Sequence, residues 1–287
     1  MKINNYDDEN DILMFNIFND YLEKFCITKN YSIELYITPF CNKKCEYCYL
    51  VKNQKDIYPK EIANEENILN NLKTFFNYLI TTKNNYIKEL SLFSGEIWHT
   101  NFGFEILNTI LYFLKEKKIS IELIIIPSNF TFILDKEKTK KIEYFIKEFY
   151  NNNTRLCFSC STDGLYLEES NRPYNNNNKD NNLNKYYDLI FNFCAKWGFG
   201  YHPMVDSNNI ELWPKQYEWW INGLLYCHQN YFKDIMFLEV RNDTWTDEKI
   251  EKFLFFINHA YDFLYQSNFF HSNIKSFIKY ILNVDHK

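Results

Sequence analysis

Residues 32–49 read SIELYITPFCNKKCEYCY, a strand-like run followed at once by a cysteine-rich loop. Apolar and polar residues alternate in the first seven positions, which predicts a half-buried β-strand over Ser32–Thr38. Three cysteines follow the strand directly, at positions 41, 45 and 48. The stretch therefore predicts that a strand carries a loop of clustered thiols at its carboxyl end.

Short β-rich runs alternate with longer runs of helical spacing along the rest of the chain. Further strands are expected at 89–93, 119–126, 155–162, 199–205 and 235–241. Helices are expected near 61–80, 103–117, 137–150, 185–197, 214–231 and 247–266. Consecutive β-then-α units predict an α/β fold in which a parallel sheet carries its helices on the outside. Because a closed barrel has eight such units, six predict a partial (β/α)6 TIM-like barrel, with an open doubly wound sheet as the alternative.

We expect three parts in the chain. Residues 1–30 form an N-terminal helical segment, residues 31–268 form the partial barrel, and residues 269–287 form a C-terminal helix. Residues 175–182 read NNNNKDNN, a low-complexity run that predicts a mobile loop after the fourth strand. The alternative for that loop is a lid over a site.

Composition and charge narrow the function classes. The 287 residues carry a net charge of −5, which argues against a dedicated nucleic-acid binder because phosphate neutralisation needs a basic stripe. No stretch approaches ~18 uncharged apolar residues, so no membrane span is expected. The polar, acidic first residues do not resemble a signal peptide. We therefore expect a cytoplasmic protein whose eight cysteines are metal ligands or buried apolar residues rather than disulfides.

The cysteine spacing is the strongest chemical signal in the sequence. Cys41, Cys45 and Cys48 have CxxxCxxC spacing, which suits three thiolates around one inorganic centre. A cubane [4Fe–4S] cluster held by three thiolates keeps one iron open, and an open position marks a reactive site. A structural zinc site in a non-catalytic adaptor is the alternative, but it needs a fourth ligand that no nearby residue supplies convincingly.

The loop resembles the hallmark of the radical S-adenosylmethionine (SAM) superfamily, in which an aromatic residue precedes the last cysteine, as Tyr47 does here. The resemblance implies that the open iron of a [4Fe–4S] cluster chelates the methionine end of SAM. It also implies that a 5′-deoxyadenosyl radical then takes a hydrogen atom from the substrate, while Tyr47 lies against the adenine. The protein positions this chemistry and excludes water.

Two further stretches are candidates for SAM contact, and the first of them matches the superfamily. Gly95 and Glu96 follow the second strand, where a Gly-Gly-Glu stretch binds the SAM amino group, although the first glycine is Ser94 here. A carboxylate facing an ammonium makes a charge-assisted hydrogen bond, which fits Glu96. At the end of the third strand, Ser128 is a second expected SAM contact. A plain turn is the alternative for both stretches.

Residues 161–164 read STDG and are followed by Arg172, one of three arginines in the chain. This stretch and the downstream arginine resemble the corresponding motif of the radical SAM branch that modifies peptides and proteins, which includes anaerobic sulfatase-maturating enzymes. The resemblance implies that Ser161 contacts the SAM ribose, that Asp163 lies near the ribose or substrate, and that Arg172 lies near the SAM carboxylate. An ordinary turn is the alternative for Asp163 and Gly164. No cysteine-rich C-terminal extension follows, so we expect a single cluster.

Three residues near the ends of the last two strands are candidates for substrate contact: His202, Glu239 and Arg241. A satisfied core histidine and a structural ion pair are the alternatives for them. Cys157 and Cys160 are expected on opposite faces of one strand, where they cannot bind one metal ion.

Taken together, the sequence predicts a radical SAM enzyme that acts on a peptide or protein side chain. A small metabolite or nucleoside precursor is the alternative substrate. A reductant such as flavodoxin or ferredoxin is the expected partner, and neither a membrane nor a nucleic acid is expected.

Overall fold

A computed structural model describes residues 32–38, 40–48, 64–93, 95–117, 119–174, 182–197, 200–227, 239–240 and 244–266. The expected N-terminal segment 1–30 and C-terminal helix 269–287 lie outside the described residues. So do Ser94, Arg241 and most of the asparagine-rich loop.

The centre of the fold is a five-stranded parallel sheet in the order β1-β2-β3-β4-β5. Its strands are β1 (Ser32–Tyr36), β2 (Tyr86–Phe93), β3 (Ser120–Ser128), β4 (Arg155–Cys160) and β5 (Gly200–Tyr201). Strand order follows chain order, so each connection is a β-α-β crossover to the neighbouring strand. The prediction of an α/β fold with a parallel sheet is confirmed.

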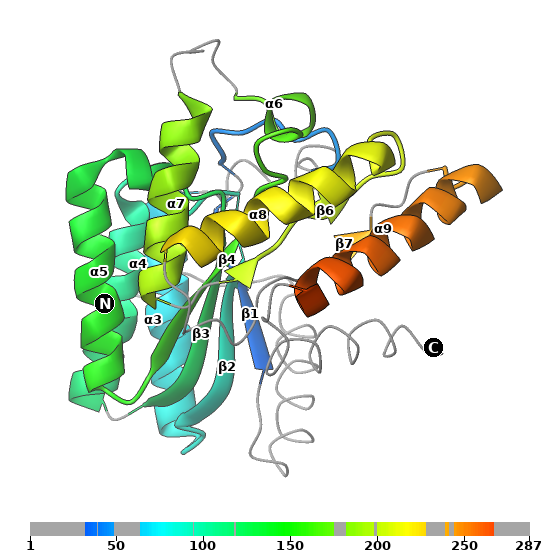
Figure 1. Cartoon of the computed structure of the whole chain (residues 1–287). Coiled ribbons are helices and arrows are strands. Elements are labelled where there is room, and N and C mark those ends of the chain that lie inside the picture. The colour runs from blue at the N-terminus through cyan, green and yellow to red at the C-terminus, as the bar shows by residue number, and fades with distance from the viewer. Residues whose placement is uncertain are drawn as a thin grey trace.

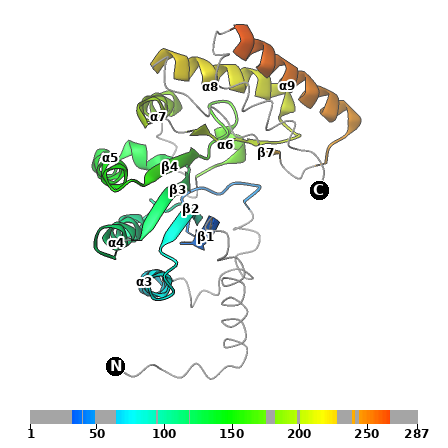
Figure 2. The same ribbon diagram turned by 90° about the horizontal axis from the view of Figure 1, so that it is seen from below.

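Each long helix follows a strand, and those that follow β1 to β4 cover one side of the sheet. Seen from below, the long helices form an arc along the outer side of the strands (Figure 2). They are α3 (Glu65–Thr81), α4 (Phe102–Lys117), α5 (Lys136–Asn151), α7 (Leu183–Trp197), α8 (Trp213–Cys227) and α9 (Asp247–Gln266). Shorter helices are η2 (Thr131–Leu134), α6 (Glu168–Asn171) and η3 (Ile210–Leu212). The apolar core lies between these layers.

Local sequence explains where the helices begin. Asn64 precedes α3 and its side chain accepts a hydrogen bond from the Glu66 N–H. Asp135 does the same for α5, where its carboxylate accepts from the N–H groups of Glu137 and Lys138. Both are preferred N-cap residues because they satisfy amides that have no partner within the helix.

The prediction of one continuous strand over 199–205 is wrong. It divides into β5 and β6 (Met204–Val205), and β6 pairs in parallel with β7 (Glu239–Val240) in a separate two-stranded sheet. Pro203 lies between the two pieces and has no N–H to donate to a ladder, which explains the break. Within the described residues, the last expected strand therefore joins β6 rather than the central sheet.

The strand faces position the site. In β4 the side chains of Leu156, Phe158 and Cys160 are buried, whereas Cys157 and Ser159 are half-buried on the opposite face. The expectation that the two cysteines of β4 face opposite sides is thus confirmed. Because all five strands are parallel, their carboxyl ends meet at one edge of the sheet. Figure 1 shows the cysteine loop in blue beside α6 at this edge.

Candidate functional site

The cysteine loop is held against the ends of neighbouring strands by backbone hydrogen bonds. Gly95 N–H donates to the Thr38 carbonyl at 2.6 Å, and Glu96 N–H donates to the Phe40 carbonyl at 2.8 Å. These two bonds place the residues after β2 directly beside the start of the loop. Parallel pairing of β1 with β2 makes this possible, because the register aligns Tyr36 with Phe93.

A second set of contacts joins the loop to the segment after β4. Lys44 N–H donates to the Pro173 carbonyl at 2.7 Å, and Glu46 N–H donates to the Asn171 carbonyl at 3.2 Å. Lys43 forms an antiparallel bridge with Tyr174. Stretches that are far apart in the sequence therefore meet at the loop.

Glu96 is buried and accepts three hydrogen bonds. Its Oε1 accepts from the Ser128 hydroxyl at 2.9 Å and from the Trp98 N–H at 3.3 Å, and its Oε2 accepts from the Asn129 N–H at 2.6 Å. Burial raises the pKa of Glu96 to about 7, against the lowering effect of these hydrogen bonds. A cation placed here would favour the carboxylate form, so the group is suited to bind an ammonium.

Asn129 extends this arrangement to the thiols. Its Nδ2 donates to Asn42 Oδ1 at 2.7 Å and lies 3.7 Å from the Cys41 sulfur. The Lys43 N–H also donates to the Cys41 sulfur, at 3.4 Å. Hydrogen bonds to sulfur are one way in which proteins tune iron–sulfur clusters. The sequence analysis named only the neighbouring Ser128. An amide residue directly after an apolar strand was the available sequence signal for Asn129.

Asp163, Tyr47 and Arg172 form a connected group. The Tyr47 hydroxyl donates to Asp163 Oδ2 at 2.9 Å, and Arg172 Nη1 donates to the same hydroxyl at 3.1 Å. Burial raises the pKa of Asp163 to about 6, while Arg172 pulls it down. Burial acts against the charge of Arg172, but Tyr47 and the nearby acids hold its pKa well above its usual value.

Lys43 and Glu168 complete the group, and the sequence analysis did not identify either of them. Lys43 Nζ lies 3.0 Å from Glu168 Oε1, and both side chains are 1 % exposed. Burial alone would raise the pKa of Glu168, but Lys43 and Arg172 outweigh it and the pKa is lowered. The spacing of Glu168 and Arg172, four residues apart, was the available sequence signal for an ion pair on a short helix.

The donor set fits an iron–sulfur cluster by its chemistry. Burial, followed by the charge of Glu96, raises the pKa of Cys41 to about 12, and burial also raises the pKa of Cys45. A bound metal reverses this effect, since a coordinating thiol is deprotonated outright. In the described part of the chain, no three potential ligands lie close enough to hold one metal ion. A cubane would space its three thiolates farther apart than a single metal ion does, because each thiolate would bind a different iron.

The second group also fits an anionic ligand. Arg172 Nε lies 3.8 Å from Glu168 Oε1, beyond hydrogen-bond range, and has no hydrogen-bond partner among the described residues. A buried guanidinium therefore keeps a free donor next to the cysteine loop. Carboxylates are the preferred acceptors for such a donor.

Comparison with known proteins bears on the fold. No protein-family model matches the sequence, and no curated protein sequence matches it. Solved structures do match: native anSMEcpe, an anaerobic sulfatase-maturating enzyme of the radical SAM class, with bound AdoMet and Cp18Cys peptide, is 18 % identical with a TM-score of 0.52. The chain has the fold of a radical SAM enzyme.

Two further anSMEcpe structures give the same result. The structure with bound AdoMet alone is 18 % identical with a TM-score of 0.52, and the structure with AdoMet and Kp18Cys peptide is 17 % identical with a TM-score of 0.51. The matches cover 84–85 % of this chain but only 62–63 % of the radical SAM enzymes. The chain thus spans less than two thirds of the length of these structural relatives.

Two of the remaining candidates for SAM or substrate contact directly follow the neighbouring strands β4 and β5. Ser161 is half-buried, and its N–H donates to the Ser128 carbonyl at 2.7 Å. His202 is half-buried, with Nδ1 2.9 Å from the Ser159 hydroxyl. Glu239 lies in β7, where only its backbone is described, and Arg241 lies outside the described residues.

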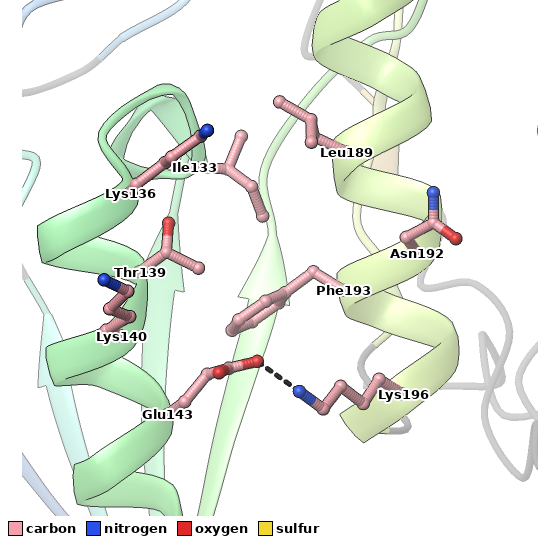
Figure 3. A pocket seen from close by; sticks show the side chains of 9 residues that line it. All are labelled: Ile133, Lys136, Thr139, Lys140, Glu143, Leu189, Asn192, Phe193 and Lys196. Carbon is pink, nitrogen blue, oxygen red and sulfur yellow. Dashed lines mark hydrogen bonds and ion pairs between the residues drawn. The ribbon is translucent and has the colours of Figure 1, made fainter.

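One surface hollow adjoins the site, and another lies apart from it. One of about 310 Å³ adjoins the cysteine loop and includes Asn42, Thr131 and Tyr174 in its lining. A groove of about 370 Å³ lies between α5 and α7, where side chains of the two helices face one another and Lys196 contacts Glu143 (Figure 3). That groove includes no residue of the cysteine loop, so we do not assign it to the site.

Among the described helices, none is long and apolar enough to cross a membrane.

Proposed function

We propose that this chain is a radical SAM enzyme that modifies a peptide or protein side chain. The observation that carries the proposal is the convergence of three separate motifs on one loop. Backbone hydrogen bonds join the cysteine loop to Glu96, and the Tyr47 hydroxyl joins it to Asp163 and Arg172. A buried acid and a buried arginine, from segments after two different strands, thus lie beside the loop that carries the three thiols.

Each residue has a distinct part in the proposal. The thiolates of Cys41, Cys45 and Cys48 each bind one iron of a [4Fe–4S] cluster. The chemistry that cluster and SAM supply when bound is a one-electron cleavage of the sulfonium, which releases methionine and a 5′-deoxyadenosyl radical that takes a hydrogen atom from the substrate. The chain's own work is to orient the two ligands and to exclude water.

Charge complementarity supports the orientation of SAM. Glu96 is the buried acid that would face the ammonium, and Ser128 holds one of its oxygens. Arg172 is the buried cation that would face the carboxylate. Opposite charges at the two positions allow only one orientation of an amino acid.

The remaining SAM contacts stay as predicted from the resemblance. Ser161 is assigned to the ribose and Tyr47 to the adenine, while Gly95 lets the backbone approach and Asp163 lies near the ribose or substrate. Tyr47 can combine its predicted contact with the bond to Asp163, because its ring and its hydroxyl are separate contact groups.

The inner side of a partial barrel is the proposed substrate cavity. Half-buried Cys157 and Ser159 lie on the strand face opposite the helices, and His202 contacts Ser159. His202, Glu239 and Arg241 are the proposed substrate contacts. Peptide-bound structures of anSMEcpe support a peptide substrate. A soluble reductant such as flavodoxin or ferredoxin would supply the electron in the cytoplasm.

The test is SAM cleavage by anaerobically reconstituted protein. The proposal predicts about four irons per chain, absorbance near about 400 nm, and 5′-deoxyadenosine after reduction with dithionite. The triple alanine variant of the three cysteines should lose all of these signals, whereas alanine at buried Cys194 should keep them. A colourless protein with one zinc and no 5′-deoxyadenosine would overturn the proposal.

A further inference from the structure

Each interval between the cysteines contains one side chain that is anchored to the segment after β4. Lys43 lies between Cys41 and Cys45, and its ammonium reaches Glu168 at 3.0 Å. Tyr47 lies between Cys45 and Cys48, and its hydroxyl reaches Asp163 at 2.9 Å. The loop is therefore attached by side chains on both sides of its central cysteine.

Glu168 is the common acceptor of this group. Its Oε1 faces Lys43, and its Oε2 accepts from the Thr162 hydroxyl at 2.6 Å and from the Asp163 N–H at 3.0 Å. The carboxylate thus fixes the backbone of the residue that holds Tyr47. Arg172, which holds Tyr47 from the other side, extends from the end of the same short helix α6.

Lys43 has little freedom to take another position. Besides the ion pair, its ammonium lies 3.6 Å from the centre of the Tyr174 ring, and its backbone bridges to the same tyrosine. The residue is 3 % exposed, which is unusual for lysine. A buried ion pair contributes little net stability compared with apolar packing, so we look for its role in the geometry of the loop.

We propose that Lys43 and Glu168 are positioning residues that fix the spacing of the three thiols before any cluster binds. That this geometry serves cluster binding rests on the proposed function. That the ion pair holds the loop in place does not depend on it. Through Glu168 the same ion pair links the thiol positions to Asp163 and Arg172, so that the cluster-binding loop and the SAM-binding side chains move as one unit.

The first test uses metal-free protein and measures alkylation of each cysteine by iodoacetamide, read by mass spectrometry. Lys43→Met and Glu168→Gln should each raise the rates at Cys41 and Cys45 about tenfold, because local opening of the loop exposes them. Buried Cys194 is the internal reference and should keep its rate. The double variant should react no faster than either single variant, since both remove one pair.

Matched variants separate positioning from general weakening. Lys43→Arg keeps the charge and should return the rates to within about twofold of wild type. Lys252→Met removes an exposed lysine that pairs with Glu211 and Glu248, and it should change no rate. Wild-type rates in both Lys43→Met and Glu168→Gln would overturn the proposal. If those variants unfold, Glu168→Asp is used instead and should raise the alkylation rates at Cys41 and Cys45 alone. An equal rise in the rate at Cys194 would also overturn the proposal.

The second test uses the reconstituted protein and reads the electron paramagnetic resonance spectrum of the reduced cluster. Lys43→Met should bind iron but alter the spectrum with SAM present and raise the Kd for SAM about tenfold, as outer-shell changes do at metal sites. An unchanged spectrum and Kd would overturn the proposal. A wild-type protein that takes up no cluster would instead refute the proposed function, and the alkylation rates would still test the positioning role.

Discussion

The backbone N–H of Asn129 donates a hydrogen bond of 2.6 Å to the buried carboxylate of Glu96. This bond joins the ends of β2 and β3, and the Asn129 side chain continues to the Cys41 sulfur. The acid assigned to the SAM ammonium and the first thiol thus share one intermediate residue. After burial, the charge of Glu96 is the next largest cause that raises the pKa of Cys41, so the two groups are electrostatically linked.

Replacing the acid should weaken SAM binding while keeping the cluster. Glu96→Gln retains the shape of the side chain but removes the charge, so the Kd for SAM should rise about tenfold or more, the value of a charged hydrogen bond. Anaerobic calorimetry measures this directly. Glu46→Gln, at an exposed position in the cysteine loop, is the matched control and should leave the Kd unchanged. Equal affinity of both variants would refute the role of Glu96.

The metal-free protein should show a pH dependence that is traceable to Asp163. Its pKa is raised from 3.8 to about 6 by burial, so between these values the folded chain holds a proton that the unfolded chain has lost. Stability contributed by this proton is present at low pH and is lost as the pH rises through the folded pKa.

Asp163→Asn removes this dependence. The difference in unfolding free energy between the variant and wild type should shift by about 1.4 kcal/mol in favour of the variant from pH 5 to pH 7.5. Urea unfolding at the two pH values measures the shift. A difference that stays constant, or that changes in the opposite direction, would contradict the assignment of the raised pKa.

Gly164 should tolerate no side chain. Its φ is +90°, and an added Cβ would lie 1.8 Å from Gln216 Nε2 in α8. Gly164→Ala therefore combines backbone strain with overpacking and should cost about 2 to 4 kcal/mol of unfolding free energy. Thermal unfolding checks the loss. The double variant Gly164→Ala with Gln216→Ala should recover only the part of the lost unfolding free energy that comes from overpacking. Recovery of the whole loss would contradict the backbone strain at Gly164.

A change far from the site should affect stability alone. Asp135 caps α5, and Asp135→Ala should cost about 1 kcal/mol because two helix amides lose their acceptor. The Kd for SAM should match that of wild type when measured well below the melting temperature. A raised Kd would indicate that the SAM affinities of the other variants report general stability and not the site.

The sequence identified the cysteine loop, Glu96 and Asp163 as candidates because short motifs at strand ends carry their own chemistry, and the structure places the three side by side. It did not predict that Lys43 and Glu168 are buried together, since the two residues are far apart in the chain and each type is usually exposed. The antiparallel contact of the loop with residues 171–174 brings the two side chains together. The single strand expected over 199–205 ignored Pro203, which lacks the N–H that a continuous ladder requires.

The central claim is that Cys41, Cys45 and Cys48 hold a cubane with one open iron. Mössbauer spectroscopy of anaerobically reconstituted, iron-57-labelled protein tests it most directly. We expect the spectrum of a [4Fe–4S] cluster in which one iron site changes when SAM is added. A spectrum without a cubane, or a cubane whose four sites ignore SAM, would contradict the account.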